Sequence, residues 1–362
     1  MPKYSSSNEF RSDTFTTPTQ SMLETVFQAS VGDSVYSEDD DTNALEKRIA
    51  ELTGKEAGLY CVSGTLANQI AVRTNLVNPP YSVLCDHRSH IYVHEAAGLA
   101  TLSQAMIVPV VPSNGCYMTL EDIQKKINVD DGDIHGAPTR LISLENTCHG
   151  VVYPIEELRR IREYFNETGI PLHCDGARLW NASVASGVSF KEYGEIFDSI
   201  SICLSKSLGA PIGSVLVGSK KFINKANHWR KQNGGGVRQS GLLARMADVA
   251  ITENLPEIVK SHQMAKDVAD FLTGKGLKLA EPCQTNFVFL DVEKSPIDLD
   301  ILAKYGEKYN VRVWPGRISF HFQNDQESVE NVKKAFWEAY QETQKLGLSN
   351  VTSKTYVSPG EK

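Results

Sequence analysis

The sequence lacks the segments that would place the protein in or across a membrane. No stretch approaches the roughly 18–20 uninterrupted apolar residues of a membrane-spanning helix. The first residues, MPKYSSSNEFRSDT, have no apolar core of the kind that a signal peptide needs. The seven cysteines include no CxxC pair, and no metal-ligand spacing occurs. We therefore expect a cytoplasmic protein with reduced thiols, no membrane contact and no metal.

Signals for nucleotide and nucleic-acid binding are absent as well. Neither GxxxxGK[ST] nor GxGxxG occurs in the sequence. The net charge is -7, and the Lys and Arg residues are scattered, so no basic face for a phosphate backbone is indicated. We expect a small-molecule ligand and no nucleic acid.

The length and the residue pattern predict two domains of α/β type. A chain of 362 residues exceeds the size, roughly 250–300 residues, at which single cores stop growing. Helical stretches alternate with short apolar strands from about Asn43 onward, which favours a large, mainly parallel sheet covered by helices. A small C-terminal α+β domain with three short strands, NFVFLDV, VRVWP and RISFHF, follows. We predict an N-terminal segment at 1–20, a large domain at 21–255, a small domain at 256–345 and a flexible tail at 346–362.

Three predicted strands end in polar residues: RLISLEN (140–146), PLHCDGA (171–177) and SISICLSKS (199–207). A helix within YPIEELRRIREYFNETG joins the first two, which predicts a β-α-β unit. The carboxyl ends of parallel strands are where α/β folds bind ligands.

Lys206 and Asp175 both fall at such strand ends. A lysine there is taken out of water, and its neutral amine is able to form an imine. A carboxylate beside a pyridinium nitrogen keeps that ring protonated, which makes the ring an electron sink. Alone, Lys206 reads as a surface charge and Asp175 as a turn residue before Gly176. Together they point to cofactor chemistry.

The segment CVSGTLANQIAV predicts a strand, a turn and an amphipathic helix. Backbone N–H groups and the hydroxyls of Ser63 and Thr65 would meet a phosphate at this helix N-terminus. Ordinary helix capping explains the same residues equally well.

Eight motifs occur in one order: RSDTFTTPT, GDSVYSEDDDTNALE, VSGTLANQ, SHIYVHEAAG, LISLENT, HCDGARLWNA, ICLSKSLGAPIGSVLVG and RKQNGGGVRQSG. With them the chain resembles the low-specificity L-threonine aldolases, closest to the yeast type, over roughly residues 10–340. The resemblance implies the aspartate-aminotransferase-like fold (fold type I) with pyridoxal 5′-phosphate (PLP) as cofactor. The implied reaction is the cleavage of L-threonine, L-allo-threonine and related β-hydroxy-α-amino acids to glycine and an aldehyde.

The resemblance also implies roles for individual residues. Lys206 would hold PLP as a Schiff base, Asp175 would contact the pyridine nitrogen, and His90 would stack on the ring. The remaining cofactor-binding candidates are Ser63, Gly64, Thr65, Arg178, Lys231 and Arg238. The candidates for the substrate carboxylate, which an arginine fork suits, are Ser12, Arg178 and Arg317.

The base at the substrate hydroxyl stays open between His90 and His135, with His94 and His149 as weaker candidates. This chain reads ENTCHG where bacterial members often read ENTHNG, so Cys148 replaces a histidine. The resemblance further implies a homotetramer, a dimer of dimers, in which Arg238 reaches the phosphate held by its neighbour.

Two alternatives remain at this point. An alanine racemase would use the same fold and cofactor. A non-catalytic scaffold would have no reason to keep Lys206 and Asp175 together.

Overall fold

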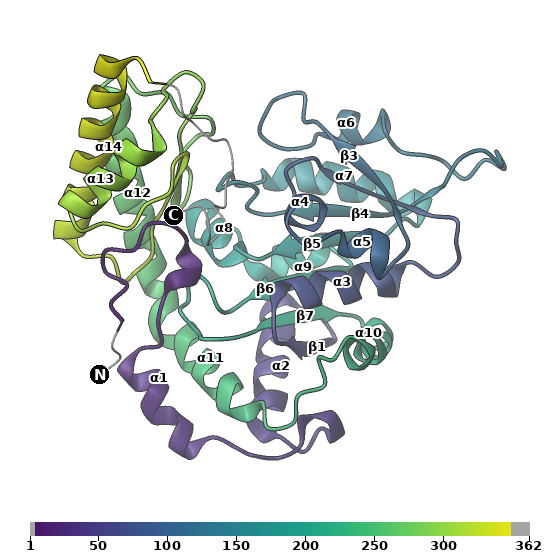
Figure 1. Ribbon diagram of the computed structural model, residues 1–362. Coiled ribbons are helices and arrows are strands. Elements are labelled where there is room, and N and C mark those ends of the chain that lie inside the picture. The colour runs from purple at the N-terminus through teal and green to yellow at the C-terminus, as the bar shows by residue number, and fades with distance from the viewer. Residues whose placement is uncertain (1–3, 349–362) are drawn as a thin grey trace. The chain divides into compact units, whose positions relative to one another are not determined.

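The structure is a computed structural model that describes residues 4–348 (Figure 1). These residues form two compact units. The large unit comprises residues 18–148 and 152–253, and the small unit comprises residues 4–17, His149–Val151 and 254–348. The predicted tail lies outside the described residues from 349 onward, after the last helix has ended at Leu346.

A seven-stranded sheet forms the centre of the large unit (Figure 1). Its strands are β1 (Ala57–Cys61), β2 (Ser82–Asp86), β3 (Met106–Val110), β4 (Thr139–Glu145), β5 (Leu172–Gly176), β6 (Ser199–Cys203) and β7 (Ser214–Gly218). Their spatial order is β1-β7-β6-β5-β4-β2-β3, and only β7 runs antiparallel to its neighbours. The predicted seven-stranded, mainly parallel sheet is confirmed.

Helices lie between the strands in the sequence. In the large unit they are α1 (Gln20–Thr25), α2 (Asp40–Thr53), α3 (Gly64–Asn75), α4 (His90–Val93), α5 (Gly98–Thr101), α6 (Leu120–Gln124), α7 (Ile155–Thr168), α8 (Leu179–Ser186), α9 (Phe190–Ile196), α10 (Lys220–Gln232) and α11 (Gly241–Asn254), with the short 3₁₀ helices η2 (Val26–Gln28) and η3 (Ser34–Tyr36). Helix α3 contacts β4, β5, β6 and β7, so its first turn reaches the edge where β5 and β6 end. Among residues 4–348, every helix falls short of the length or apolar character that crossing a bilayer demands.

The predicted β-α-β unit is formed by β4, α7 and β5. Leu158, Ile161 and Phe165 recur at helical spacing on α7, and all three are buried. Gly169 ends the helix with φ of 69°, a left-handed conformation that glycine adopts without steric cost.

The small unit builds its own core around a two-stranded sheet. Its elements are η1 (Asp13–Phe15), η4 (Leu255–Glu257), α12 (Ile258–Gly274), β8 (Phe287–Phe289), α13 (Leu299–Lys308), β9 (Arg317–Ser319) and α14 (Gln326–Leu346). Residues 4–17, which are part of the N-terminal segment predicted at 1–20, lie in this unit, and Phe10 is fully buried in its core. The Phe10 N–H also donates to the Arg312 carbonyl at 2.9 Å, and the Ser319 N–H donates to the Phe10 carbonyl at 2.8 Å.

One predicted strand of the small unit, VRVWP, is wrong. Only Arg312 of this segment pairs, in an isolated bridge with Glu9. Pro315 has no N–H to donate, and Gly316 follows with φ of 73°, so the ladder does not extend toward β9.

All seven cysteines lie within the described residues, where none is joined in a disulfide, and five of them are buried. The predicted burial of most cysteines agrees with this.

Candidate active site

The ends of β5 and β6 and the first turn of α3 surround a cavity of about 190 Å³. Its lining residues are Ser63, Gly64, Thr65, Asn68, His90, Asp175, Ala177, Cys203, Ser205 and Lys206. Six of these were candidates from the sequence. The structure therefore brings together the amine, the carboxylate, the imidazole and the helix start that the sequence analysis treated one by one.

Lys206 and Asp175 meet because their strands are parallel and in register. Asp175 pairs with Ser201 across β5 and β6, so both strands end at the same edge of the sheet. The chain leaves β6 at Cys203, whose carbonyl accepts a hydrogen bond from the Trp180 indole N–H at 2.9 Å. Lys206 follows in a turn that the Gly209 N–H closes on the Lys206 carbonyl at 2.8 Å.

Asp175 is held by neutral donors. Its side chain is buried, with only 2% of the residue exposed. Oδ2 accepts a hydrogen bond from Asn68 Nδ2 at 2.7 Å, and Oδ1 accepts one from the Ala177 N–H at 3.1 Å. The bond to Ala177 is the contact of a local turn, and the bond to Asn68 on α3 additionally fixes the carboxylate at the cavity wall.

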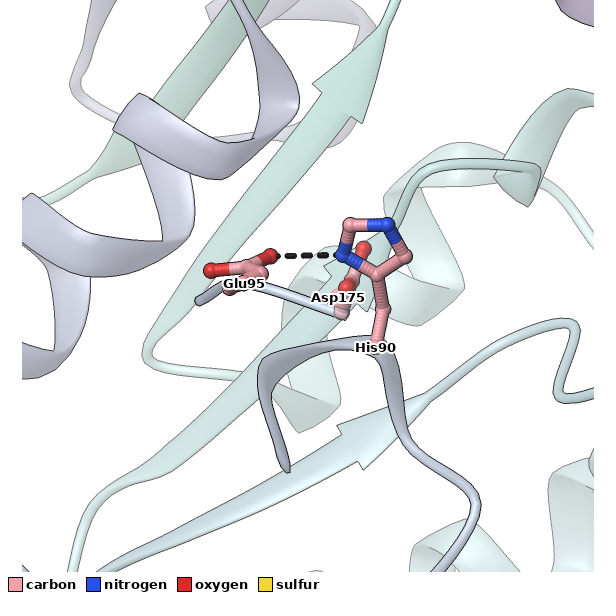
Figure 2. A group of neighbouring side chains, drawn as sticks. All are labelled: His90, Glu95 and Asp175. Atoms are coloured by element: carbon pink, nitrogen blue, oxygen red, sulfur yellow. Dashed lines mark hydrogen bonds and ion pairs between the residues drawn. The ribbon is translucent and has the colours of Figure 1, made fainter. Parts of the chain in front are cut away.

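His90 lines the same cavity. Its Nδ1 lies 2.8 Å from Glu95 Oε1. A carboxylate oxygen only accepts, so Nδ1 carries the proton and Nε2 points away from Glu95 (Figure 2). Burial lowers the pKa of His90, but the hydrogen bond to Glu95 and the charges of Asp175 and Glu145 outweigh it, and the net pKa is raised.

Glu145 ends β4 beside Asp175, its partner in the strand register. Its Oε2 accepts a hydrogen bond from the His90 N–H at 2.7 Å. Burial, reinforced by the charge of Asp175, raises the pKa of Glu145 to about 8. Glu145 therefore interacts electrostatically with both Asp175 and His90 at this edge of the sheet.

The start of α3 forms the remaining wall. Ser63 caps the helix, since its Oγ accepts a hydrogen bond from the Leu66 N–H at 3.1 Å. A Cβ at Gly64 would lie 2.6 Å from Cys203 Sγ, so this position requires glycine for the close approach of α3 to β6. Capping and anion binding are compatible here, because the Gly64 and Thr65 backbone still faces the cavity at the positive end of the helix dipole.

The residues of this cavity fit PLP. A lysine amine that could bind it covalently lines the cavity, a buried carboxylate suits the ring nitrogen, and a helix N-terminus suits the phosphate. The imidazole of His90 offers a flat face for the ring.

His90, Glu95 and Asp175 also form a compact group in which one ligand atom of each lies within 4.8 Å of the others (Figure 2). Hydrogen bonds explain this grouping. His90 Nδ1 donates to Glu95 Oε1 at 2.8 Å, and Asn68 Nδ2 donates to both Glu95 and Asp175, which holds the three side chains together.

Several other candidates lie elsewhere in the large unit. Arg178 is the N-cap residue of α8, three positions after Asp175. Lys231 lines a second cavity of about 210 Å³ on α10. Arg238 forms an ion pair with Asp33 at 3.0 Å. His135 lies on a loop with 87% of its side chain exposed and pairs with Asp133, outside the cavity that holds Lys206.

The small unit holds Ser12 and Arg317. Ser12 caps η1, and Arg317 at the start of β9 donates to the carbonyl of Arg11, the residue before Ser12, at 2.8 Å. These two candidates are therefore neighbours. His149 also belongs to this unit and stacks on Phe289, with ring centroids 4.8 Å apart.

Sequence reasoning missed Asn68, Glu95 and Glu145. Asn68 lies in the motif that was interpreted through residues 63–65, and Glu95 lies in the motif that was interpreted through His90. A signal was available for Asn68: it follows Gly64 by four positions, so it lies on the same face of α3 as the phosphate-binding candidates.

His173 supports Asn68 from behind the cavity. Its Nε2 lies 3.2 Å from Asn68 Oδ1 and its Nδ1 lies 2.9 Å from Ser199 Oγ. Burial lowers the pKa of His173 to about 4. The neutral imidazole satisfies both contacts, one nitrogen donating and the other accepting.

This neutral histidine predicts a loss of stability in acid. Between pH 6.5 and about pH 4, His173 binds a proton in the unfolded chain but not in the folded protein. The free energy of unfolding therefore falls as the pH falls through this window. His173→Gln should therefore lose less unfolding free energy than wild type between pH 7 and pH 5, by about 2 kcal/mol. Urea unfolding of the cofactor-free protein at both pH values measures this. His262→Gln is a matched second variant, because burial also lowers the pKa of His262 to about 4. An equal loss in wild type and His173→Gln would contradict the assignment.

Comparisons with known proteins agree with this site. Residues 9–295 match the model of the family described as beta-eliminating lyase. The low specificity L-threonine aldolase of Saccharomyces cerevisiae is 61% identical over 94% of this chain and 88% of its own length. The alanine racemase TOXG of Cochliobolus carbonum is 37% identical over 91% and 86%.

Solved structures share the fold. Leishmania major threonine aldolase superposes with a TM-score of 0.77 at 20% identity, covering 92% of this chain and 99% of that one. A structure of SPT with a PLP internal aldimine gives a TM-score of 0.69 at 16% identity, covering 93% and 88%. The fold and the site thus define an enzyme of PLP fold type I, as the sequence led us to expect. The expected cofactor, PLP, and the expected class, a carbon–carbon lyase, agree with the family model and with the Saccharomyces cerevisiae relative. The chain belongs to the beta-eliminating lyase family and, within it, to the low-specificity L-threonine aldolases.

Proposed function

We propose that this chain catalyses the PLP-dependent retro-aldol cleavage of L-threonine, L-allo-threonine and related β-hydroxy-α-amino acids to glycine and an aldehyde. The observation that carries the proposal is the cavity that places Lys206, Asp175 and the start of α3 together. The high identity to a threonine aldolase over nearly the whole chain supports the choice of substrate.

When bound, PLP supplies an electron sink for the electron pair that a broken Cα–Cβ bond leaves on the substrate. Lys206 provides the amine that holds the cofactor. Asp175, fixed by Asn68 and Ala177, would contact the ring nitrogen and keep it protonated. Its burial would strengthen that contact because little water competes with it.

His90 is the base that the described site offers for the β-hydroxyl proton. Its Nδ1 proton is committed to Glu95, so Nε2 is the atom left to accept. The raised pKa of His90 strengthens that acceptor. A role for His135 at the hydroxyl, and for Ser12, Arg178 and Arg317 at the substrate carboxylate, stays a prediction from the sequence.

Product analysis tests the proposed reaction. The PLP-loaded protein is incubated with L-threonine, L-allo-threonine and both D-forms, and glycine and acetaldehyde are measured. We expect equal amounts of the two products from the L-forms. Formation of D-alanine from L-alanine without acetaldehyde would favour a racemase instead, the reading to which the likeness to TOXG gives some weight. A purified protein that takes up no PLP and stays colourless would favour the scaffold reading.

We further propose a homotetramer, a dimer of dimers, whose active sites are shared between subunits. Two phosphate-binding candidates do not line the cavity that holds Lys206. Lys231 lines the second cavity, and Arg238 forms an ion pair with Asp33 of its own chain. Binding of these residues to the phosphate of a neighbouring subunit would explain their positions.

Mixed refolding tests the shared site. Lys206→Ala and Arg238→Ala proteins, each poorly active alone, should regain activity when they are unfolded and refolded together. The hybrid dimer then has one site with Lys206 from one chain and Arg238 from the other, both wild type. Hybrids confirmed by a tag difference that are no more active than the sum of the parents would refute sharing.

A cytoplasmic location is also proposed. The seven cysteines, none of which is disulfide-bonded among the described residues, support it, because a reducing compartment keeps thiols unpaired. Fractionation of cells that express the full chain is the corresponding measurement.

A further inference from the structure

Asn68 on α3 uses its whole hydrogen-bonding capacity inside the large unit. Its Nδ2 donates to Asp175 Oδ2 at 2.7 Å and to Glu95 Oε1 at 3.0 Å. Its Oδ1 accepts from Ser201 Oγ at 2.5 Å and faces His173 Nε2 at 3.2 Å. Only 2% of the residue is exposed, so water does not substitute for these partners.

These partners determine which way the amide points. Two carboxylates only accept hydrogen bonds, so they require the NH₂ end of Asn68. The Ser201 hydroxyl and the neutral His173 then donate to its oxygen, and His173 in turn accepts from Ser199 Oγ through Nδ1. A flipped amide would set its oxygen against two carboxylates, so this orientation is the only one that satisfies every partner.

The amide lies where two functional branches of the site meet. Asp175 is the group proposed for the ring nitrogen, and Glu95 is the group that fixes the imidazole of His90. The two carboxylates are close, with one oxygen of each within 4.8 Å of the other. Their charges repel, and a low-dielectric interior strengthens this repulsion. One N–H from Asn68 to each carboxylate offsets the repulsion and fixes both oxygens.

We propose that Asn68 is a positioning residue of the active site, which holds Asp175 at the PLP ring nitrogen while it holds Glu95 against His90. This inference rests on the proposed function, since it assigns Asp175 to the ring nitrogen. Asn68 acts through the two carboxylates and needs no contact with the substrate.

A purely structural role for Asn68 would have a different consequence. A buried amide that only fills space and satisfies its neighbours would affect folding stability alone, and the bound cofactor would be unchanged. The protonation of the cofactor's ring nitrogen therefore distinguishes the two roles.

The test uses the full-length protein loaded with PLP that carries ¹⁵N in the ring. The ¹⁵N chemical shift of that nitrogen reports whether it is protonated, and it does not depend on turnover. In Asn68→Ala the signal should move from the protonated position of wild type toward the unprotonated one. The dissociation constant for PLP should rise about tenfold, the effect of losing one hydrogen bond to a charged group.

Two further variants make the result decisive. Ser201→Ala removes one partner of Asn68 Oδ1 without touching Asp175, so it should move the signal in the same direction by a smaller amount. It also keeps the proposal testable if Asn68→Ala does not fold. Gln69→Ala is the matched control, because Gln69 donates to Glu95 Oε2 at 2.6 Å and not to Asp175. It should leave the signal where wild type has it.

The outcomes are distinct. A signal and a dissociation constant that stay at wild-type values in Asn68→Ala and Ser201→Ala would overturn the role of Asn68, and so would an equal shift in Gln69→Ala. A wild-type protein that binds no PLP would instead contradict the proposed function.

Discussion

Lys206→Ala is expected to abolish aldol cleavage and to remove the visible absorbance of the lysine-bound cofactor. Lys206 is the lysine that lines the cavity among the described residues, so no other amine there replaces it. We expect kcat to fall by at least about a thousandfold, as for other residues that carry a covalent step. Spectra and turnover of the purified variant measure both effects.

Lys221→Ala is a suitable control for this prediction. Lys221 is exposed in the first turn of α10, and its removal changes the net charge by the same amount. The control should keep both the absorbance and the activity. Retention of both by Lys206→Ala would show that the cofactor is held elsewhere.

Asp175→Ala is expected to slow cleavage by about a hundredfold or more, because the loss of one preorganised electrostatic group at a reacting centre has effects of this size. The ring nitrogen would lose the group that keeps it protonated, and the retention of PLP should weaken as well. The rate is compared per bound cofactor, so that lost cofactor is not mistaken for a slower reaction. Asp175→Asn keeps the shape and the contact with the Ala177 N–H while it removes the charge.

The two Asp175 variants distinguish charge from shape. If charge is what matters, Asp175→Asn should be nearly as slow as Asp175→Ala. Equal rates per bound cofactor in Asp175→Ala and wild type would mean that the carboxylate has no part in the electron sink.

The sequence was sufficient for the sheet and for the pair at its edge. Apolar runs of strand length, each ending in polar residues, marked β4, β5 and β6, and parallel strands necessarily bring such ends together. Lys206 and Asp175 follow from that pattern although 31 positions separate them. Gly169 marked the end of α7 for an equally local reason, the left-handed turn that follows the helix.

Features that depend on distant contacts were harder to predict. The assignment of residues 4–17 to the small unit follows from the burial of Phe10 among residues of α12 and α14, some 250 positions away or more. VRVWP has the composition of a strand, but Arg312 is its one residue with a β-pairing partner among the described residues. In both cases the deciding partner is remote in the sequence.

The same limit applies to the polar groups around the cofactor site. Glu95 and Asn68 have ordinary local readings, as a loop carboxylate and a helix amide. Their importance depends on β5 and β6, which bring His173, Asp175 and Ser201 beneath α3. His135, in contrast, was a candidate base from the sequence, and its side chain is largely exposed.

The most direct test of the central claim is to locate the cofactor on the chain. Borohydride reduction of the PLP-loaded protein fixes the cofactor to the amine that holds it, and peptide mapping by mass spectrometry identifies that amine. The account predicts the added mass of one reduced cofactor on the peptide that contains Lys206. Stoichiometric modification of any other lysine, with Lys206 unmodified, would contradict it.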